Sequence, residues 1–333
     1  MNLQRVDPLS LDARTAEQLA EVKNASAQAA GISVLPINAA SIAAEARYTH
    51  DDRPYDAMWL VREDEDGDAV AMASLELSRW DNPHLALGFC SVHPNVRRRG
   101  IGTQLLRAQA AYCRDQERSL LLTFCHRGTA GEDLLLEYGF EVAQPMAQRR
   151  LYPQRVDYDQ IQLLADDAAG KAGDYELIRL DGPAPDEWLP GLVSLFEAMN
   201  DAPQDDMDTT PDVYPVERLR AYDAAMSHRR QHLYRLIARH LPTGEWAGHT
   251  IVCVDEHSPG MAMQEDTTVI EAHRGHRLGM WLKATMLLWL REEQPGLETI
   301  DTWNAESNGH MIAVNDELGC VVNSRGTALQ LHL

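Results

Sequence analysis

The first half of the chain alternates short apolar runs with stretches of helical spacing. Leu106, Ala110 and Cys113 recur at i, i+4 and i+7, which is the spacing of an amphipathic helix. The runs "AMWLVRE" and "LALGFCSV" are short and rich in residues that favour strands. We predict helices over 11–30, 102–116 and 130–140, and strands over 57–63, 69–78, 85–92 and 119–126.

The second half repeats this order of elements. We predict helices over 186–200, 216–230, 278–293 and 309–319, and strands over 232–240, 245–256, 266–270 and 298–305. When Arg97 is placed on Arg274, an offset of 177 residues, Gly102 falls on Gly279 and Val92 on Val269. A matching strand, arginine-glycine turn and helix in both halves indicates an internal duplication.

The alternation of strands and helices predicts a mixed α/β fold, and a length of 333 residues predicts two domains. The stretch "ADDAAGKAGD" at 165–174 is small, polar and contains glycine, which is typical of a linker. We therefore expect an N-terminal domain over 1–160, a linker over 161–175 and a C-terminal domain over 176–333.

The charge of the chain argues against nucleic acid as a partner. The net charge is −21, from 30 basic and 51 acidic residues, whereas binding to a phosphate backbone needs clustered positive charge. An acidic surface favours solubility and attracts cationic small molecules. The five cysteines are widely spaced, with no C-x-x-C pair, so neither a disulfide framework nor a zinc site is expected. With no apolar run of membrane length or leader pattern, we expect a cytoplasmic protein that needs no membrane and no metal.

One turn carries most of the chemical signal. A strand ends at Val92, Pro94 interrupts it, and Arg97-x-x-Gly100-x-Gly102 leads directly into a helix. The first turn of a helix has unpaired N–H groups and the positive end of the helix dipole, so glycines there let a phosphate come close. The spacing is neither that of the dinucleotide motif G-x-G-x-x-G nor that of the P-loop. The turn therefore predicts a site for a pyrophosphate.

The stretch "V-x-P-x-x-R-R-R-G-I-G-x-x-L-L" resembles the acyl-CoA signature of the GNAT superfamily of N-acyltransferases. The resemblance extends over most of both halves and suggests a tandem bacterial architecture, of which mycothiol synthase is an example. It implies two GNAT-like domains, each a mixed and mostly antiparallel sheet flanked by helices. It also implies that the CoA pyrophosphate binds at Val92, Arg97, Arg98, Arg99, Gly100, Ile101, Gly102 and Thr103.

The second copy of the turn departs from the family pattern, because Arg277 stands where the first glycine belongs. Its residues matched to the motif are Val269, Arg274, Gly275, His276, Arg277, Leu278 and Gly279. The family's later motif favours the second half, where Asn308 fits the asparagine at the start of the last helix. Asn315 occupies the place of the usual tyrosine, and the first half has Gly128 and Leu135 at these two places.

The resemblance also implies a catalytic base, since GNAT enzymes often use a carboxylate on the strand before the motif. Glu265 lies four residues before Val269 and shares its side-chain parity, whereas the first half has Gly88 at that place. A β-bulge would give the role to Asp266 instead, and both residues also suit an ordinary turn. We predict that Glu265 and Asn304 lie near the thioester in the second half, with Asn308 beside the cofactor, and we identify no general acid.

The predicted function is transfer of an acetyl or other short acyl group from acetyl-CoA to a primary amine, with a small cationic acceptor suggested by the charge. We predict that the first half binds acyl-CoA and that the second half is the catalytic centre. The alternative is a degenerate tandem that binds acyl-CoA without turnover, as a sensor or scaffold. A nucleotide-binding module is a third option. The oligomeric state is not predicted.

Overall fold

The computed structural model describes residues 1–33, 35–64 and 67–333. The chain forms two compact units that are not contiguous in sequence. Unit 1 comprises residues 1–146, 204–210 and 323–333, and unit 2 comprises residues 147–203 and 211–322. The division therefore differs from the expected one at 1–160 and 176–333, because the last strand of the chain completes the sheet of the first unit.

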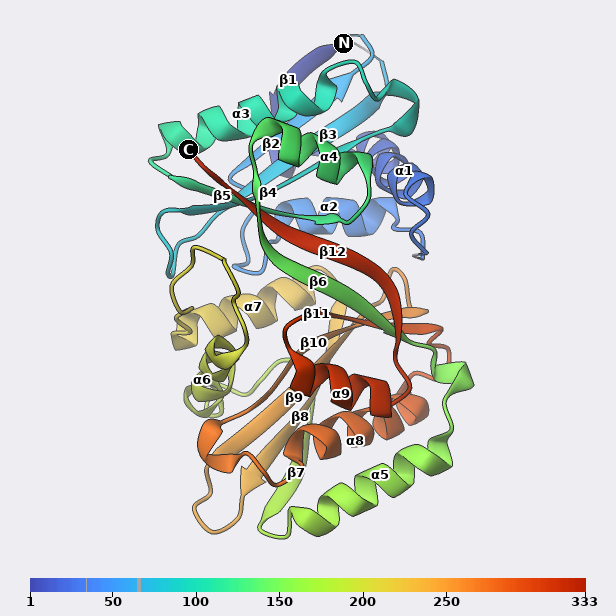
Figure 1. Cartoon of the computed structure of the whole chain (residues 1–333), viewed down its shortest axis with the longest axis vertical. Helices are drawn as coiled ribbons and strands as arrows, with labels where there is room; N and C mark the ends of the chain where they lie inside the picture. Colours follow the sequence, from blue (N-terminus) through green and yellow to red (C-terminus); the bar gives the residue numbers. More distant parts are fainter. Residues whose placement is uncertain (34, 65–66) are drawn as a thin grey trace. The chain divides into compact units, whose positions relative to one another are not determined.

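Unit 1 has a sheet in the order β1-β2-β3-β4-β5-β12 (Figure 1). Its neighbouring strands are antiparallel except for β4 and β5, which are parallel. The strands are β1 (Asn2–Val6), β2 (Ala57–Arg62), β3 (Ala69–Leu77), β4 (Leu85–Val92), β5 (Leu120–His126) and β12 (Val321–His332), and the helices are α1 (Ala13–Ala29), α2 (Ala39–Arg47), α3 (Ile101–Asp115) and α4 (Ala130–Tyr138).

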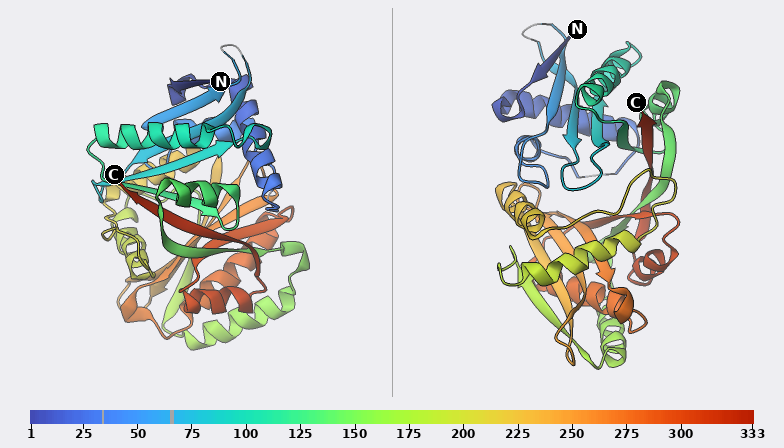
Figure 2. Two further views of the ribbon diagram at one scale, coloured as in Figure 1. Left: turned by 45° about the horizontal axis from the view of Figure 1, so that its top comes forward. Right: turned by 90° about the vertical axis from the view of Figure 1, so that its left-hand side faces the viewer.

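The two faces of this sheet are covered by different helices. Along β2, Met58 and Leu60 pack against α1 and α2, whereas Trp59 and Val61 pack against α3 and α4. This alternation is the period of a strand that is buried on both faces. On β12, Leu329 is fully buried in the core beneath α3 and α4. The C-terminus of the chain consequently lies in unit 1, as Figure 2 shows from two further directions.

Unit 2 has a sheet in the order β6-β11-β10-β9-β8-β7, with β10 and β11 parallel. The helices α6 and α7 pack on one face, and α5 and α8 pack on the other (Figure 1). Its strands are β6 (Glu141–Leu151, of which 147–151 lie in this unit), β7 (Tyr175–Asp181), β8 (Gln231–His240), β9 (Trp246–Asp255), β10 (Met261–Val269) and β11 (Thr299–Ala305), and its helices are α5 (Tyr158–Lys171), α6 (Leu189–Glu197), α7 (Val216–His228), α8 (Leu278–Glu293) and α9 (Gly309–Glu317).

The stretch expected to be a linker, 161–175, forms most of α5 and the first residue of β7. Ile161, Leu164, Ala165 and Ala168 have helical spacing and are buried against the core that contains α8. Asp157 caps the helix by accepting hydrogen bonds from the amides of residues 159 and 160. The small polar residues lie on the exposed side of α5, so their composition alone resembles that of a linker.

Most predicted elements of both halves are present within one to three residues of their expected ends, except for β10, which begins five residues earlier than expected. The strands β1, β6, β7 and β12 and the helices α2 and α5 were not predicted. The duplication is visible at the turns: the 3₁₀ segments Pro94–Val96 and Glu271–His273, like the first residues of α3 and α8, are offset by 177 residues. The remaining short 3₁₀ segments are Pro8–Ser10, Pro153–Arg155 and Ala198–Asp201.

Candidate acyl-CoA site

The turn between β4 and α3 in unit 1 is held by Arg97. Its Nε donates to the carbonyl of Val92 at 3.1 Å, and its guanidinium donates to Ser26 Oγ at 2.6 Å. Gly100 then adopts the left-handed conformation, with φ of 78°, immediately before the first residue of α3. Arg97, predicted to contact a pyrophosphate, is therefore already engaged in fixing the shape of the turn.

Arg98 and Arg99 have a different environment from Arg97. Both are exposed, and neither side chain has an ion pair or a hydrogen bond within the described residues. In the same part of the structure, no side chain caps the N-terminus of α3. The first amides of a helix lack partners inside the helix, so this end of α3 presents free N–H groups beside two positive charges. That combination suits a phosphate or pyrophosphate group.

The equivalent turn in unit 2 has the same backbone but different charges. Arg274 Nε donates to the carbonyl of Val269 at 3.0 Å, which repeats the bond between Arg97 and Val92. Its guanidinium, however, pairs with the carboxylate of Asp201. Arg277 occupies the place of Gly100 and adopts the left-handed conformation, with φ of 57°.

Arg277 is also paired with carboxylates. Its guanidinium lies 3.1 Å from Glu317 Oε1 and 3.8 Å from Asp167 Oδ2. The two arginines of this turn are thus neutralised by acidic side chains of the same unit. His276 is exposed and packs on the ring of Tyr175, with the two ring centroids 5.3 Å apart. The N-terminus of α8 is consequently less suited to an anion than that of α3.

The glycines of the two turns do not all act by admitting a ligand. A Cβ atom at Gly102 would lie 2.4 Å from Leu134 Cδ2, so this glycine lets α3 pack closely against α4. A Cβ at Gly100 or Gly279 would meet nothing within 4 Å. Gly100 is needed for its left-handed backbone. The interpretation that Gly102 mainly admits a phosphate is therefore incomplete.

The remaining residues matched to the motif lie in the first turns of the two helices or, for Gly275, just before α8. The side chains of Ile101 and Leu278 are buried in the cores of their units, so only their backbone amides face a ligand. Thr103 is half-buried on α3. Gly275 is exposed and has a φ of 88°, which a glycine adopts without strain.

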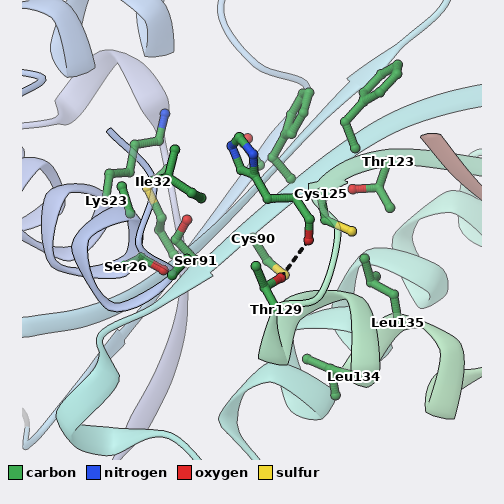
Figure 3. Close-up of a pocket in the computed structure, with 18 of the residues that line it drawn as sticks. Lys23, Ser26, Ile32, Cys90, Ser91, Thr123, Cys125, Thr129, Leu134 and Leu135 are labelled. Carbon is green, nitrogen blue, oxygen red and sulfur yellow. Dashed lines mark hydrogen bonds between the residues drawn. The ribbon is translucent and has the colours of Figure 1, made fainter. Parts of the chain in front are cut away.

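A cavity of about 400 Å³ adjoins this turn in unit 1. It exists because β4 and β5 pair only at residues 85–87 and 120–122 and then separate. Residues from both faces of the sheet line it, among them Ser26 of α1 and Leu134 of α4 (Figure 3). The gap between the parallel strands thus passes through the sheet and gives an elongated ligand a path from the α3 turn.

The ends of the two separating strands carry the same pair of residues. Phe89 and Cys90 of β4 have the register positions of Phe124 and Cys125 of β5, an offset of 35 that continues the pairing of Leu85 with Leu120. The two phenylalanine rings stack, with centroids 6.4 Å apart, and both rings line the cavity and are exposed to solvent. Burial raises the pKa of Cys90 to about 11 and that of Cys125 to about 12, so both thiols stay protonated at neutral pH.

These cavity residues were not predicted from the sequence. The signal that could have found them is the repeated Phe-Cys pair, in "GFCSV" and in "TFCH", at the ends of the two strands. His126, the last residue of β5, and Lys23 of α1 also line the cavity. Lys23 pairs with Glu45 of α2 at 3.2 Å.

The predicted base of unit 2 lies in a β-bulge, as one of the two interpretations of that stretch required. The register of β10 against β9 shifts between Gln264 and Thr267, so Glu265 and Asp266 together face one residue of β9. Burial, together with the charge of Asp266, raises the pKa of Glu265 to about 7. Burial also raises the pKa of Asp266 to about 6.

The asparagines predicted to lie near Glu265 have other contacts. Asn308 is the N-cap of α9, where its Oδ1 accepts from the amide of Met311 at 3.2 Å. Asn304 accepts a 2.8 Å hydrogen bond from Asn315, which is fully buried. Asn308 thus caps the start of α9, and Asn304 contacts the same helix near its end.

The described residues were also compared with the requirements of a membrane span and of a metal site. None of their helices is long and apolar enough to cross a membrane. Their histidines, cysteines and carboxylates form no cluster of three or more that could hold a metal ion.

Comparison with known proteins shows what the fold of this chain is similar to. Residues 33–140 match the model of the Acetyltransferase (GNAT) family. The whole chain is similar to the tandem GNAT protein from the clavulanic acid biosynthesis pathway, at 24% identity and a TM-score of 0.79 over 99% of this chain and 98% of that one. No curated protein sequence gives a significant match.

Two further structures share the fold along the chain. A GCN5-related N-acetyltransferase from Sphaerobacter thermophilus is 15% identical, with a TM-score of 0.70 over 99% of this chain and 95% of that one. A putative acetyltransferase from Pyrococcus horikoshii is 14% identical, with a TM-score of 0.56 over 100% of this chain and 89% of that one. Residues 33–140 therefore have the pattern of a GNAT domain, and the chain as a whole has the fold of a tandem GNAT protein.

Proposed function

We propose that the protein transfers an acyl group, with acetyl as the simplest case, from CoA to a primary amine, and that unit 1 binds the acyl-CoA. The observation that carries this proposal is the exposed, unpaired state of Arg98 and Arg99 at the uncapped N-terminus of α3, beside a cavity of about 400 Å³. The pyrophosphate would bind the first amides of α3. The pantetheine arm and the thioester would extend into the gap between β4 and β5.

The acceptor amine in this proposal is a small cation. The stacked and exposed rings of Phe89 and Phe124 line the cavity, and aromatic faces attract ammonium groups. In the reaction the amine nitrogen bonds to the thioester carbonyl carbon, the carbon–sulfur bond breaks, and CoA leaves as a thiol after taking up a proton. The ammonium first gives up one proton to solvent, because a protonated nitrogen has no lone pair with which to attack, and the nitrogen loses a second proton as the amide forms.

The prediction that unit 2 is the catalytic centre requires a second acyl-CoA site there. Glu265 and Asp266, which share the bulge, are the candidate bases of such a site, and their raised pKa values of about 7 and about 6 suit proton transfer near neutral pH. Against this, Arg274 and Arg277 are held by carboxylates. We therefore favour unit 1 as the site of the thioester, with unit 2 in a supporting role.

The proposal is tested by replacing two arginines with glutamine, first in the turn of unit 1 and then in the turn of unit 2. We expect Arg98→Gln combined with Arg99→Gln to weaken acetyl-CoA binding at least about tenfold in titration calorimetry, which corresponds to about 1.4 kcal/mol. The matched pair in unit 2, Arg274→Gln with Arg277→Gln, should leave the affinity within about twofold of the wild type. The reverse ranking would place the acyl-CoA site in unit 2.

Turnover is measured as release of free CoA thiol from acetyl-CoA in the presence of a panel of primary amines, including diamines and amino sugars. The enzyme proposal expects thiol release that depends on the amine. Tight binding of acetyl-CoA with no thiol release on any amine would instead support the alternative of a sensor or scaffold.

A further inference from the structure

The cavity of unit 1 contains few groups that can exchange a proton near neutral pH. The titratable side chains that line it are those of Lys23, Glu45, Tyr55, Cys90, Arg97, Cys125 and His126. A carboxylate on β4, the usual expectation for a GNAT base, is absent among these residues, since β4 contributes Phe89, Cys90 and Ser91. The proton acceptor for an amine in unit 1 must therefore come from another element.

Most members of this set are excluded as bases by their contacts or by their chemistry. Arg97 is a guanidinium, which stays protonated, and it is bound to Val92 and Ser26. Cys90 and Cys125 keep their protons because burial raises the pKa of each thiol to about 11 and about 12. Tyr55 is a phenol, and phenols lose their proton only in alkaline solution.

Glu45 and Lys23 form an ion pair at 3.2 Å, and each of these side chains is about one-third exposed. A carboxylate held by an ammonium group is a weak base, because protonation would give up the pairing. The pair also lies on α1 and α2, whereas the gap in the sheet is bounded by β4 and β5. His126 is the remaining candidate.

The position of His126 is fixed by three elements. It is the last residue of β5, and its backbone has Gly326 of β12 as its register partner. Its carbonyl accepts a 2.8 Å hydrogen bond from the hydroxyl of Thr129, the N-cap of α4, drawn as the dashed line in Figure 3. The imidazole is half-buried and lines the cavity. These contacts hold the backbone of His126, so the imidazole can reach a substrate in the cavity by rotation of its side chain alone.

We propose that His126 is the general base of unit 1, which takes a proton from the acceptor amine as the amine attacks the thioester carbonyl. This inference rests on the proposed function of unit 1. The nitrogen–carbon bond forms, the carbon–sulfur bond breaks, and the proton moves from the amine nitrogen to the imidazole. The resulting imidazolium then returns a proton to the leaving thiolate or to solvent.

The electrostatics of the cavity are consistent with this role. Burial lowers the pKa of His126 below its ordinary value of 6.5, so the imidazole is neutral at pH 7 and can accept a proton. The charged groups of the cavity are Lys23, Glu45 and Arg97, of which the first two neutralise each other. Activity should therefore fall on the acid side, as pH decreases through the lowered pKa of His126.

The test compares His126→Gln and His126→Ala with the wild type, and uses His310→Gln as the control because His310 is an exposed histidine of α9 in unit 2. With an amine that is turned over, we expect His126→Gln to lower kcat about 10²- to 10⁴-fold. The affinity for acetyl-CoA should stay within about twofold of the wild type. The acid limb of the rate–pH profile should disappear, and added imidazole should partly restore His126→Ala.

The outcomes separate this inference from the proposed function. If His126→Gln keeps both the wild-type kcat and the acid limb while the arginines of unit 1 still control binding, the base is another group and only this inference fails. If the wild type binds acetyl-CoA in unit 1 but turns over no amine, the enzyme proposal fails and the inference fails with it. If His126→Gln loses acetyl-CoA affinity in proportion to kcat, His126 serves binding rather than proton transfer.

Discussion

Gly102 has one role in the sequence analysis and another in the structure. The motif predicts that it admits a phosphate, whereas the structure shows that it leaves room for Leu134. In unit 1 a Cβ atom at this position would lie 2.4 Å from Leu134 Cδ2. The matched residue Gly279 in unit 2 has nothing within 4 Å of such an atom. We therefore compare Gly102→Ala with Gly279→Ala, two identical changes in the first turn of equivalent helices.

The magnitudes follow from the two environments. Replacing a helical glycine by alanine stabilises a helix by up to about 1 kcal/mol, and Gly279→Ala should show this gain in full. Gly102→Ala has the same gain, but the end of the half-buried Leu134 side chain must turn away from the new methyl group, which costs about 0.5–1.5 kcal/mol. We expect Gly102→Ala to be about 1 kcal/mol less stable than Gly279→Ala.

The measurement is urea denaturation of both variants, together with titration of acetyl-CoA. Because Leu134 lines the cavity, a Leu134 side chain pushed into that space in Gly102→Ala should obstruct the cavity and weaken acetyl-CoA binding. Adding Leu134→Ala removes the clash and should recover affinity in the double variant. If the double variant still fails to bind, or if the two single variants are equally stable, Gly102 does not act through this contact.

Three further predictions concern charged or titratable side chains of unit 2. Arg150 and Asp301 form a bidentate pair in unit 2, with side chains 3% and 2% exposed. Arg150→Met should therefore lower the free energy of unfolding by about 3–5 kcal/mol, whereas adding Asp301→Leu should restore most of it. Because the pKa of Glu265 is raised to about 7 in the folded protein, its contribution to the free energy of unfolding is full below pH 4.5 and is lost as pH rises through about 7. Glu265→Gln should therefore flatten the fall of the melting temperature over this range of pH. Burial lowers the pKa of His249 to about 3, so its contribution to the free energy of unfolding is full above pH 6.5 and is lost towards pH 3. In thermal melts recorded from pH 7 to pH 4, His249→Phe should therefore lose less stability on acidification than the wild type.

The sequence predicted the features of the structure that are local in the chain. The turn from Val92 to Gly102 is one continuous segment, and its strand, break and helix start can each be identified from neighbouring residues. The repeat at 177 residues was visible for the same reason. The β-bulge at Glu265 was one of two interpretations, because a polar stretch inside a strand suits a bulge and a turn equally well.

The features that were not predicted depend on residues that are distant in sequence. Composition could not show that Arg274 meets Asp201, or that Arg277 meets Glu317 and Asp167, and these pairs decide which turn has free positive charge. The cavity depends on where two parallel strands stop pairing, which no local pattern reports. Likewise, β12 completes the sheet of unit 1 although it lies at the end of the second half of the chain.

The central claim is that acyl-CoA binds at the N-terminus of α3 in unit 1. A crystal structure of the protein with acetyl-CoA tests it most directly. We predict density for the pyrophosphate at the amides of residues 100–103, with Arg98 or Arg99 in contact, and density for the thioester in the gap between β4 and β5. Density for acetyl-CoA at the N-terminus of α8, with the turn of unit 1 free of ligand, would contradict the account.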